Sequence, residues 1–167
     1  MNNIESIEID SHEAGYTILG DYPAKWTPMN KETADHSLPY IVGMTLLDGK
    51  IDNSSYSLKK MRDPRILDLL RKTTVKEDKE LTKMYPEAAP NRVTVKLSDG
   101  KTVSEQVSYH KGHPKNPMTN IEIENKFRNL TSRYFESSKC GKVLKLLWNL
   151  EKLEDVSSLL RSIAIPK

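Results

Sequence analysis

The segment VTVKLSDGKTVSEQVSY, residues 93–109, carries the clearest structural signal in this chain. Apolar and polar side chains alternate on both sides of Asp99-Gly100, which is the pattern of two half-buried strands. Asp-Gly supplies the positive backbone angles that a tight hairpin turn needs. The segment therefore predicts a β-hairpin over about 92–109, and this hairpin is the starting point for the rest of the fold.

Two further strands are expected on the N-terminal side of the hairpin. Ile4, Ile7 and Ile9 stand among polar residues near the start of the chain, and residues 73–77 have the composition of a short strand. Together with the hairpin, these segments predict an antiparallel sheet of about four strands.

Helix signals lie between and after these strands. The segment 38–47 is apolar almost all round, which is typical of a helix buried between other elements. Capping residues mark three helix starts: Ser37 before the apolar segment, Asp63 before Pro64, and Thr119 with Glu122 before a helix over about 120–135. Helices packed with an antiparallel sheet define the α+β class.

The C-terminal residues carry an apolar stripe with charged residues opposite. Its members recur at helical spacing and are Val143, Leu146, Leu147, Leu150, Leu153, Val156, Leu160 and Ile163. The stripe predicts one or two amphipathic helices, with a break near Glu154-Asp155. We therefore expect an α+β domain over residues 1–136 and C-terminal helices over 137–167 that pack on a partner.

Composition excludes several classes of protein. The chain has 167 residues, 37% of them apolar and 29% charged, which is close to ordinary soluble domains. A net charge of +3 without a basic block gives no indication of nucleic-acid binding. The N-terminal residues have neither a basic start nor an apolar run, so no signal peptide and no membrane span are expected. We expect a cytoplasmic protein.

The strongest candidate site is the stretch Glu32-Thr33-Ala34-Asp35-His36-Ser37-Leu38-Pro39-Tyr40. It places two carboxylates, an imidazole, two hydroxyls and a phenol at the start of the apolar helix, where free backbone N–H groups favour an anion. Such groups could hold a polycarboxylate and move a proton. The alternative is an elaborate helix cap, in which Asp35 or Ser37 satisfies the helix start and Tyr40 is a half-buried prop.

Other reactive side chains give no second site. His110 and His113 share a loop, but no second pair of metal ligands lies near them in the sequence, so we assign no metal. Cys140 is the single cysteine and has no local base to activate it. The scattered glycines match no phosphate-binding pattern, and we expect no cofactor.

The stretch 32–42, followed by Leu47-Asp48-Gly49, resembles the signature of the MmgE/PrpD family, which includes 2-methylcitrate dehydratase. The order of the later elements is also similar to that family and covers nearly the whole chain. These elements are Asp63-Pro64-Arg65, a strand, the hairpin around Asp99-Gly100, the loop from Gly112 to Thr119, and Lys126-Phe127.

The resemblance implies the smaller α+β lid of a lyase whose active site lies between this lid and a larger helical domain. Family members act on small polycarboxylates by acid–base chemistry without a metal, as in propionate catabolism. Tyr40 matches a lid tyrosine of the family, and His36 is a nearby donor, so both are expected to bind substrate. The lid histidine of the family belongs upstream of the first strand, and His12 does not match its context.

Two hypotheses follow for the function. The first is a lid part or subunit of a 2-methylcitrate dehydratase-like lyase that is inactive alone, because the catalytic acids and bases of the helical domain are not among these residues. No catalytic residue is assigned with this hypothesis, and its partner is a helical-domain chain. The second is a non-catalytic remnant or protein-binding module that forms homo-oligomers through its C-terminal helices.

Overall fold

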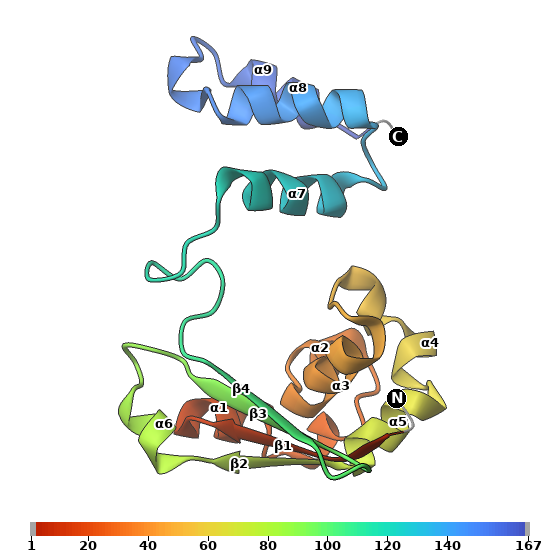
Figure 1. Ribbon diagram of the computed structural model, residues 1–167. Coiled ribbons are helices and arrows are strands. Elements are labelled where there is room, and N and C mark those ends of the chain that lie inside the picture. Colours follow the sequence, from red (N-terminus) through yellow and green to blue (C-terminus); the bar gives the residue numbers. More distant parts are fainter. Residues whose placement is uncertain (1–2, 166–167) are drawn as a thin grey trace. The chain divides into compact units, whose positions relative to one another are not determined.

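The computed structural model describes residues 3–165, which fall into two units that divide after His110. The first unit holds the sheet, and the regular elements described in the second unit are helices (Figure 1). The sequence predicts a different boundary, at residue 136, between the α+β domain and the C-terminal helices. That boundary concerns how these helices pack in a larger protein, and it stays a prediction. Residues 1–2 and 166–167, at the ends of the predicted ranges, lie outside the described part.

The sheet of the first unit has four strands in the order β2-β1-β3-β4. Their bounds are β1 Ile4–Ser11, β2 Thr73–Glu77, β3 Asn91–Leu97 and β4 Thr102–Val107. β3 and β4 pair antiparallel from Asn91↔Val107 to Lys96↔Thr102, and Gly100 adopts a φ of 86° in the turn between them. The predicted hairpin and the α+β class are therefore confirmed.

The prediction of a purely antiparallel sheet was wrong, because the sheet is mixed. β1 pairs antiparallel with β3 but parallel with β2, with Ile9 opposite Val93 on one side and Val75 on the other. Parallel neighbours need a long crossover connection, and the helices between residues 12 and 72 provide it. The strand pattern in the sequence is the same for both directions, so it could not distinguish them.

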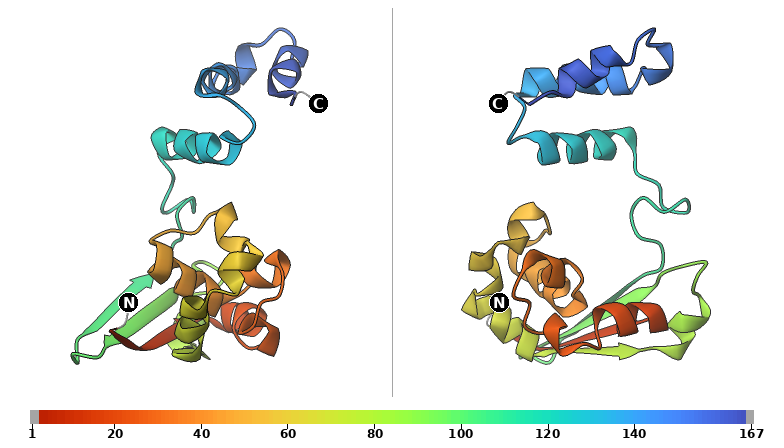
Figure 2. Two further views of the ribbon diagram at one scale, coloured as in Figure 1. Left: turned by 90° about the vertical axis from the view of Figure 1, so that its right-hand side faces the viewer. Right: turned by 180° about the vertical axis from the view of Figure 1, so that it is seen from behind.

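The crossover contains most of the helices of the first unit. They are α1 Glu13–Leu19, η1 Pro23–Lys25, α2 Lys31–Asp35, α3 Leu38–Asp48, η2 Asn53–Tyr56, α4 Leu58–Met61 and α5 Pro64–Arg71. The helix α6, Lys79–Lys83, follows β2. Figure 1 and Figure 2 show α2 and α3 gathered on one side of the sheet.

The core lies between this side of the sheet and α3 and α5. Ile7 and Ile9 of β1 are fully buried, and they share one apolar cluster with Met44 of α3 and Ile66 of α5. Gly43 allows the two helices to approach closely, because a Cβ atom there would lie 2.9 Å from the Cδ1 atom of Ile66. The apolar segment 38–47 is thus a helix packed into the core, as its sequence predicts.

The second unit contains the helices α7 Asn120–Thr131, α8 Ser137–Leu147 and α9 Ser157–Ile163, with the short turn η3 Leu150–Lys152. The predicted capping box is present, since the Thr119 hydroxyl accepts from the Glu122 N–H and the Glu122 carboxylate accepts from the Thr119 N–H. Along residues 3–165, no helix is long and apolar enough to span a membrane.

Candidate functional site

The stretch 32–40 forms the end of α2, the two-residue link His36-Ser37 and the first turn of α3. Asn30 caps α2 by accepting from the Thr33 N–H, and Ser37 caps α3 by accepting from the Tyr40 N–H at 3.1 Å. The Ser37 hydroxyl also donates to the Lys25 carbonyl. Of the two cap candidates in the sequence, Ser37 is therefore the cap of α3, and Asp35 is left for another contact.

That contact is with the imidazole of His36. Its Nδ1 atom lies 2.7 Å from Asp35 Oδ1 and 3.1 Å from the carbonyl oxygen of Glu32. Both partners are acceptors, so Nδ1 carries the proton, and Nε2 has no hydrogen-bond partner among residues 3–165. The hydrogen bond to Asp35, with a further one to Glu32, raises the pKa of His36 above its usual range.

This arrangement can support acid–base chemistry. A carboxylate that holds one imidazole nitrogen orients the ring and stabilises its protonated form, while the other nitrogen is free to accept or donate a proton. The side chain of His36 is 52% exposed, so a ligand can reach it. Sequence reasoning included both residues in the stretch but did not identify Asp35 as the group that orients His36.

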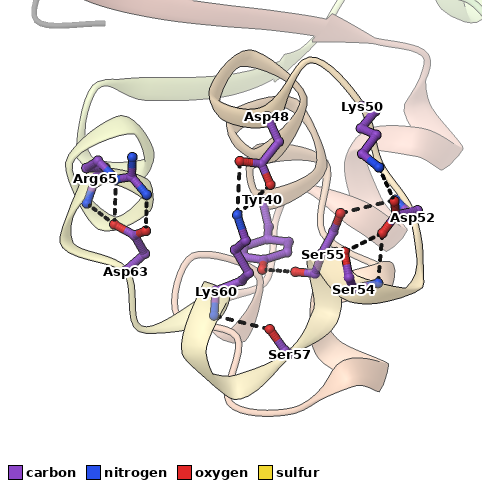
Figure 3. Close-up of polar contacts among 10 residues, drawn as sticks. All are labelled: Tyr40, Asp48, Lys50, Asp52, Ser54, Ser55, Ser57, Lys60, Asp63 and Arg65. Carbon is purple, nitrogen blue, oxygen red and sulfur yellow. Dashed lines mark hydrogen bonds and ion pairs between the residues drawn. The ribbon is translucent and has the colours of Figure 1, made fainter.

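Tyr40 has a different environment, because its side chain is fully buried. Its hydroxyl donates to the backbone carbonyl of Ser55 at 2.5 Å (Figure 3), and its ring lies 6.4 Å from that of Tyr56. Burial raises the pKa of the phenol to about 12. In this structure the hydroxyl faces the η2 segment rather than solvent.

Polar contacts hold the η2 segment over Tyr40 (Figure 3). Asp52 accepts from the Ser54 N–H at 2.8 Å and from the Ser54 hydroxyl at 2.6 Å, and Lys50 pairs with Asp52 at 2.8 Å. Farther along, Lys60 pairs with Asp48 at the end of α3, at 2.7 Å. Hydrogen bonds within the segment thus fix its shape, and the Lys60–Asp48 ion pair joins the following helix α4 to the end of α3.

The two predicted substrate-binding residues therefore belong to separate groups of contacts. His36 lies with Asp35 and Glu32 at the surface, whereas Tyr40 lies with Ser55 inside the fold. No hydrogen bond joins His36 to Tyr40 in the described part of the chain. Their assignment as substrate-binding residues stays a prediction.

Another histidine of the first unit, His12, has structural contacts. His12 caps α1 by accepting from the Gly15 N–H at 3.3 Å, and its ring stacks on Tyr85 with the centroids 4.7 Å apart. Burial lowers the pKa of His12. Cys140, in the second unit, is buried and contacts the Thr131 hydroxyl at 3.3 Å.

Three groups near the start of α3 have metal-ligand chemistry. One ligand atom each from Glu32, Asp35 and His36 lie within 4.8 Å of one another. Exposed acidic groups often cluster without an ion, and the Asp35–His36 hydrogen bond accounts for the short distance between those two residues. The prediction that this protein needs no metal stays a prediction.

The fold and the site define a class of protein: an α+β domain with a mixed sheet that presents a carboxylate-oriented histidine at a helix start. Residues 1–152 match the model of the MmgE/PrpD C-terminal domain. The chain therefore belongs to the MmgE/PrpD family, as the stretch 32–42 indicated.

Curated relatives in this family carry two kinds of enzyme name. Cis-aconitate decarboxylase of Aspergillus terreus is 26% identical over 99% of this chain and 34% of its own length, and that of Homo sapiens is 28% identical over 79% and 27%. The 2-methylcitrate dehydratase of Cupriavidus necator is 30% identical over 91% of this chain and 32% of its own length. The chain thus spans about a third of the length of these relatives and corresponds to the C-terminal domain of the family.

Proposed function

We propose that this chain is the smaller α+β part of a lyase of the MmgE/PrpD type and that this lyase acts on a small polycarboxylate. The family match over residues 1–152 supports the class, and the names of the relatives support dehydration or decarboxylation. The Asp35–His36 pair is the observation that carries the proposal, because it supplies an oriented and exposed acid–base group at a helix start.

In this proposal His36 contacts the substrate and Asp35 is its positioning residue. The Nε2 atom of His36 binds a substrate carboxylate when the ring is protonated and takes a proton from carbon or oxygen when it is neutral. The hydrogen bond to Asp35 raises the pKa of His36 and so favours the protonated imidazole. The chemistry needs no resident metal.

Tyr40 contributes in this proposal as a hydrogen-bond donor and not as a base. A phenol with a pKa of about 12 stays protonated at neutral pH. Because its hydroxyl is bonded to Ser55 in this structure, it can reach a substrate only if the η2 segment moves. With the segment in place, Tyr40 instead holds the backbone next to the start of α3.

We further propose that a helical domain supplies the remaining acids and bases, so this chain has no turnover by itself. The stretch 32–40 offers one exposed, oriented histidine, whereas proton abstraction and protonation of a leaving group usually need two groups with different pKa values. A cleft between two domains is a common place for such a site.

The test is to combine this chain with the helical domain of a family member, expressed separately. The complex is assayed for dehydration of 2-methylcitrate and for decarboxylation of cis-aconitate, with and without a chelator. We expect turnover by the complex, none by this chain alone, and no effect of the chelator. A His36→Gln variant should lower kcat by about 10²-fold or more.

Two variants distinguish roles within this assay. Asp35→Asn should shift the pH profile of the reaction to lower pH, because the raised pKa of His36 depends on that carboxylate. Lys31→Gln, an exposed change on the same short helix, should have no effect. A complex that forms without turnover, or a His36→Gln complex as active as the parent, contradicts the proposal.

One observation favours the second candidate function, self-association through the C-terminal helices. Apolar side chains of the second unit are exposed in the described structure, including Ile121 at 72% and Leu160 at 58%. A concentration-dependent oligomer in analytical ultracentrifugation that Leu160→Glu dissociates, combined with an inactive helical-domain complex, would favour the binding module. A monomer under the same conditions would exclude it.

A further inference from the structure

An apolar pocket opens on the first unit, between the loop that precedes α2 and the helices α4 and α5. Its floor is formed by Pro28 and Met61, which are buried, and by the partly buried Leu67. Met29, 68% exposed, and Leu58, 54% exposed, form an apolar rim. The volume is about 240 Å³, below the roughly 300–1,000 Å³ of sites that hold drug-sized ligands, so the pocket suits a short ligand.

One cationic residue lines this pocket, Arg62. Two neighbouring cations have partners, since Lys60 pairs with Asp48 at 2.7 Å and Arg65 with Asp63 at 2.7 Å (Figure 3). The side chain of Arg62 has neither an ion pair nor a hydrogen bond to any residue in the range 3–165. Its charge is therefore available to an anion at the edge of an apolar cavity.

These two properties select a chemical class of ligand. The apolar walls favour a hydrocarbon chain, and the single guanidinium favours one carboxylate, which it can bind with two parallel hydrogen bonds. A polycarboxylate is disfavoured, because its further carboxylates would lie against apolar side chains without partners. We propose that this pocket binds a short-chain aliphatic monocarboxylate, with its carboxylate on Arg62 and its chain over Met61.

This proposal does not rest on the lyase function. If the pocket does not bind a monocarboxylate, the proposed lyase function is unaffected, and the reverse also holds. The methionines at the floor and rim suit a ligand whose chain can vary in length, because methionine side chains are unbranched and adaptable. Hexanoate is therefore a suitable probe, with hexanol and citrate as comparison ligands that lack the charge or the chain.

The experiment follows amide signals of the isotope-labelled 167-residue chain by NMR during titration with each probe. We expect saturable shifts with hexanoate at residues 58–67, and binding of hexanol that is roughly tenfold weaker or more, because it lacks the charge-assisted hydrogen bonds. No saturable shifts with hexanoate, or equal affinity for hexanol or citrate, would overturn the proposal.

Three variants test the role of Arg62. Arg62→Gln should weaken hexanoate roughly tenfold or more, and Lys59→Gln, an exposed neighbour outside the pocket, should leave it unchanged. Leu58→Glu should abolish binding without unfolding the chain, because residue 58 lies one helical turn before Arg62 and its carboxylate would pair with the guanidinium. Binding that survives both Arg62→Gln and Leu58→Glu contradicts the proposal.

Discussion

Replacing Tyr40 by Phe removes one hydroxyl from a fully buried side chain and keeps nearly all of its volume. The lost group donates to the backbone carbonyl of Ser55 at 2.5 Å, and Ser55 is itself only 2% exposed. The change therefore removes one hydrogen bond and leaves a buried carbonyl oxygen without that donor. The packing of the ring against the core is retained.

The size of the effect is set by the carbonyl oxygen that is left behind. Removing one partner of a buried hydrogen bond, so that the other partner stays unsatisfied, costs about 1–3 kcal/mol. Water that enters beside η2 would bring the loss to the lower end of this range. We therefore expect Tyr40→Phe to lower the free energy of unfolding by about 1–3 kcal/mol.

Urea denaturation followed by circular dichroism measures this quantity, and Tyr56→Phe is the matched control. Tyr56 is partly buried and its ring lies 6.4 Å from that of Tyr40, but its hydroxyl makes no hydrogen bond within residues 3–165. The control should change stability by less than about 0.5 kcal/mol. An equal slope against urea in all three proteins would show that the same unfolding reaction is compared.

A Tyr40→Phe protein as stable as the control would refute this reasoning, because the hydroxyl would then not be held by Ser55. In that case the phenol would be free to contact a substrate without movement of η2. The stability measurement thus decides between a structural hydroxyl and an available one, before any activity is measured.

Further predictions concern the helix ends and the histidines. Gly49→Ala should lower the free energy of unfolding by about 1–2 kcal/mol, because Gly49 ends α3 at a φ of 71°. Gly141→Ala within α8 should raise it by about 0.5–1 kcal/mol, since a Cβ atom there meets no other group within 4 Å. Urea denaturation measures both changes, and a change of the same sign in the two variants would contradict the predictions. NMR titration should place the pKa of His36 above 6.5 and that of His12 below it. The stabilisation from His36 is then complete below pH 6.5 and is lost as pH rises through its raised pKa, while that from neutral His12 is lost as pH falls below 6.5 through its lowered pKa. Asp35→Asn should bring the pKa of His36 down, and no change would contradict the pairing.

Structural features that depend on residues close together in the chain could be predicted from the sequence. The alternation around Asp99-Gly100 predicted the hairpin, and the spacing of Thr119 and Glu122 predicted the start of α7. Each depends on backbone groups a few residues apart, so the local sequence contains all the atoms involved. The stretch 32–42 predicted the family in the same way, because its residues are consecutive.

Contacts between distant residues were decided by the tertiary structure. The parallel direction of β2 depends on a crossover of about sixty residues, and the bond from Tyr40 to Ser55 depends on how η2 packs over α3. The burial of Tyr40 and the exposure of His36 follow from that packing, although both belong to one continuous stretch. The sequence by itself determined which residues form the candidate site, and only the packing of the crossover decided which of them a ligand can reach.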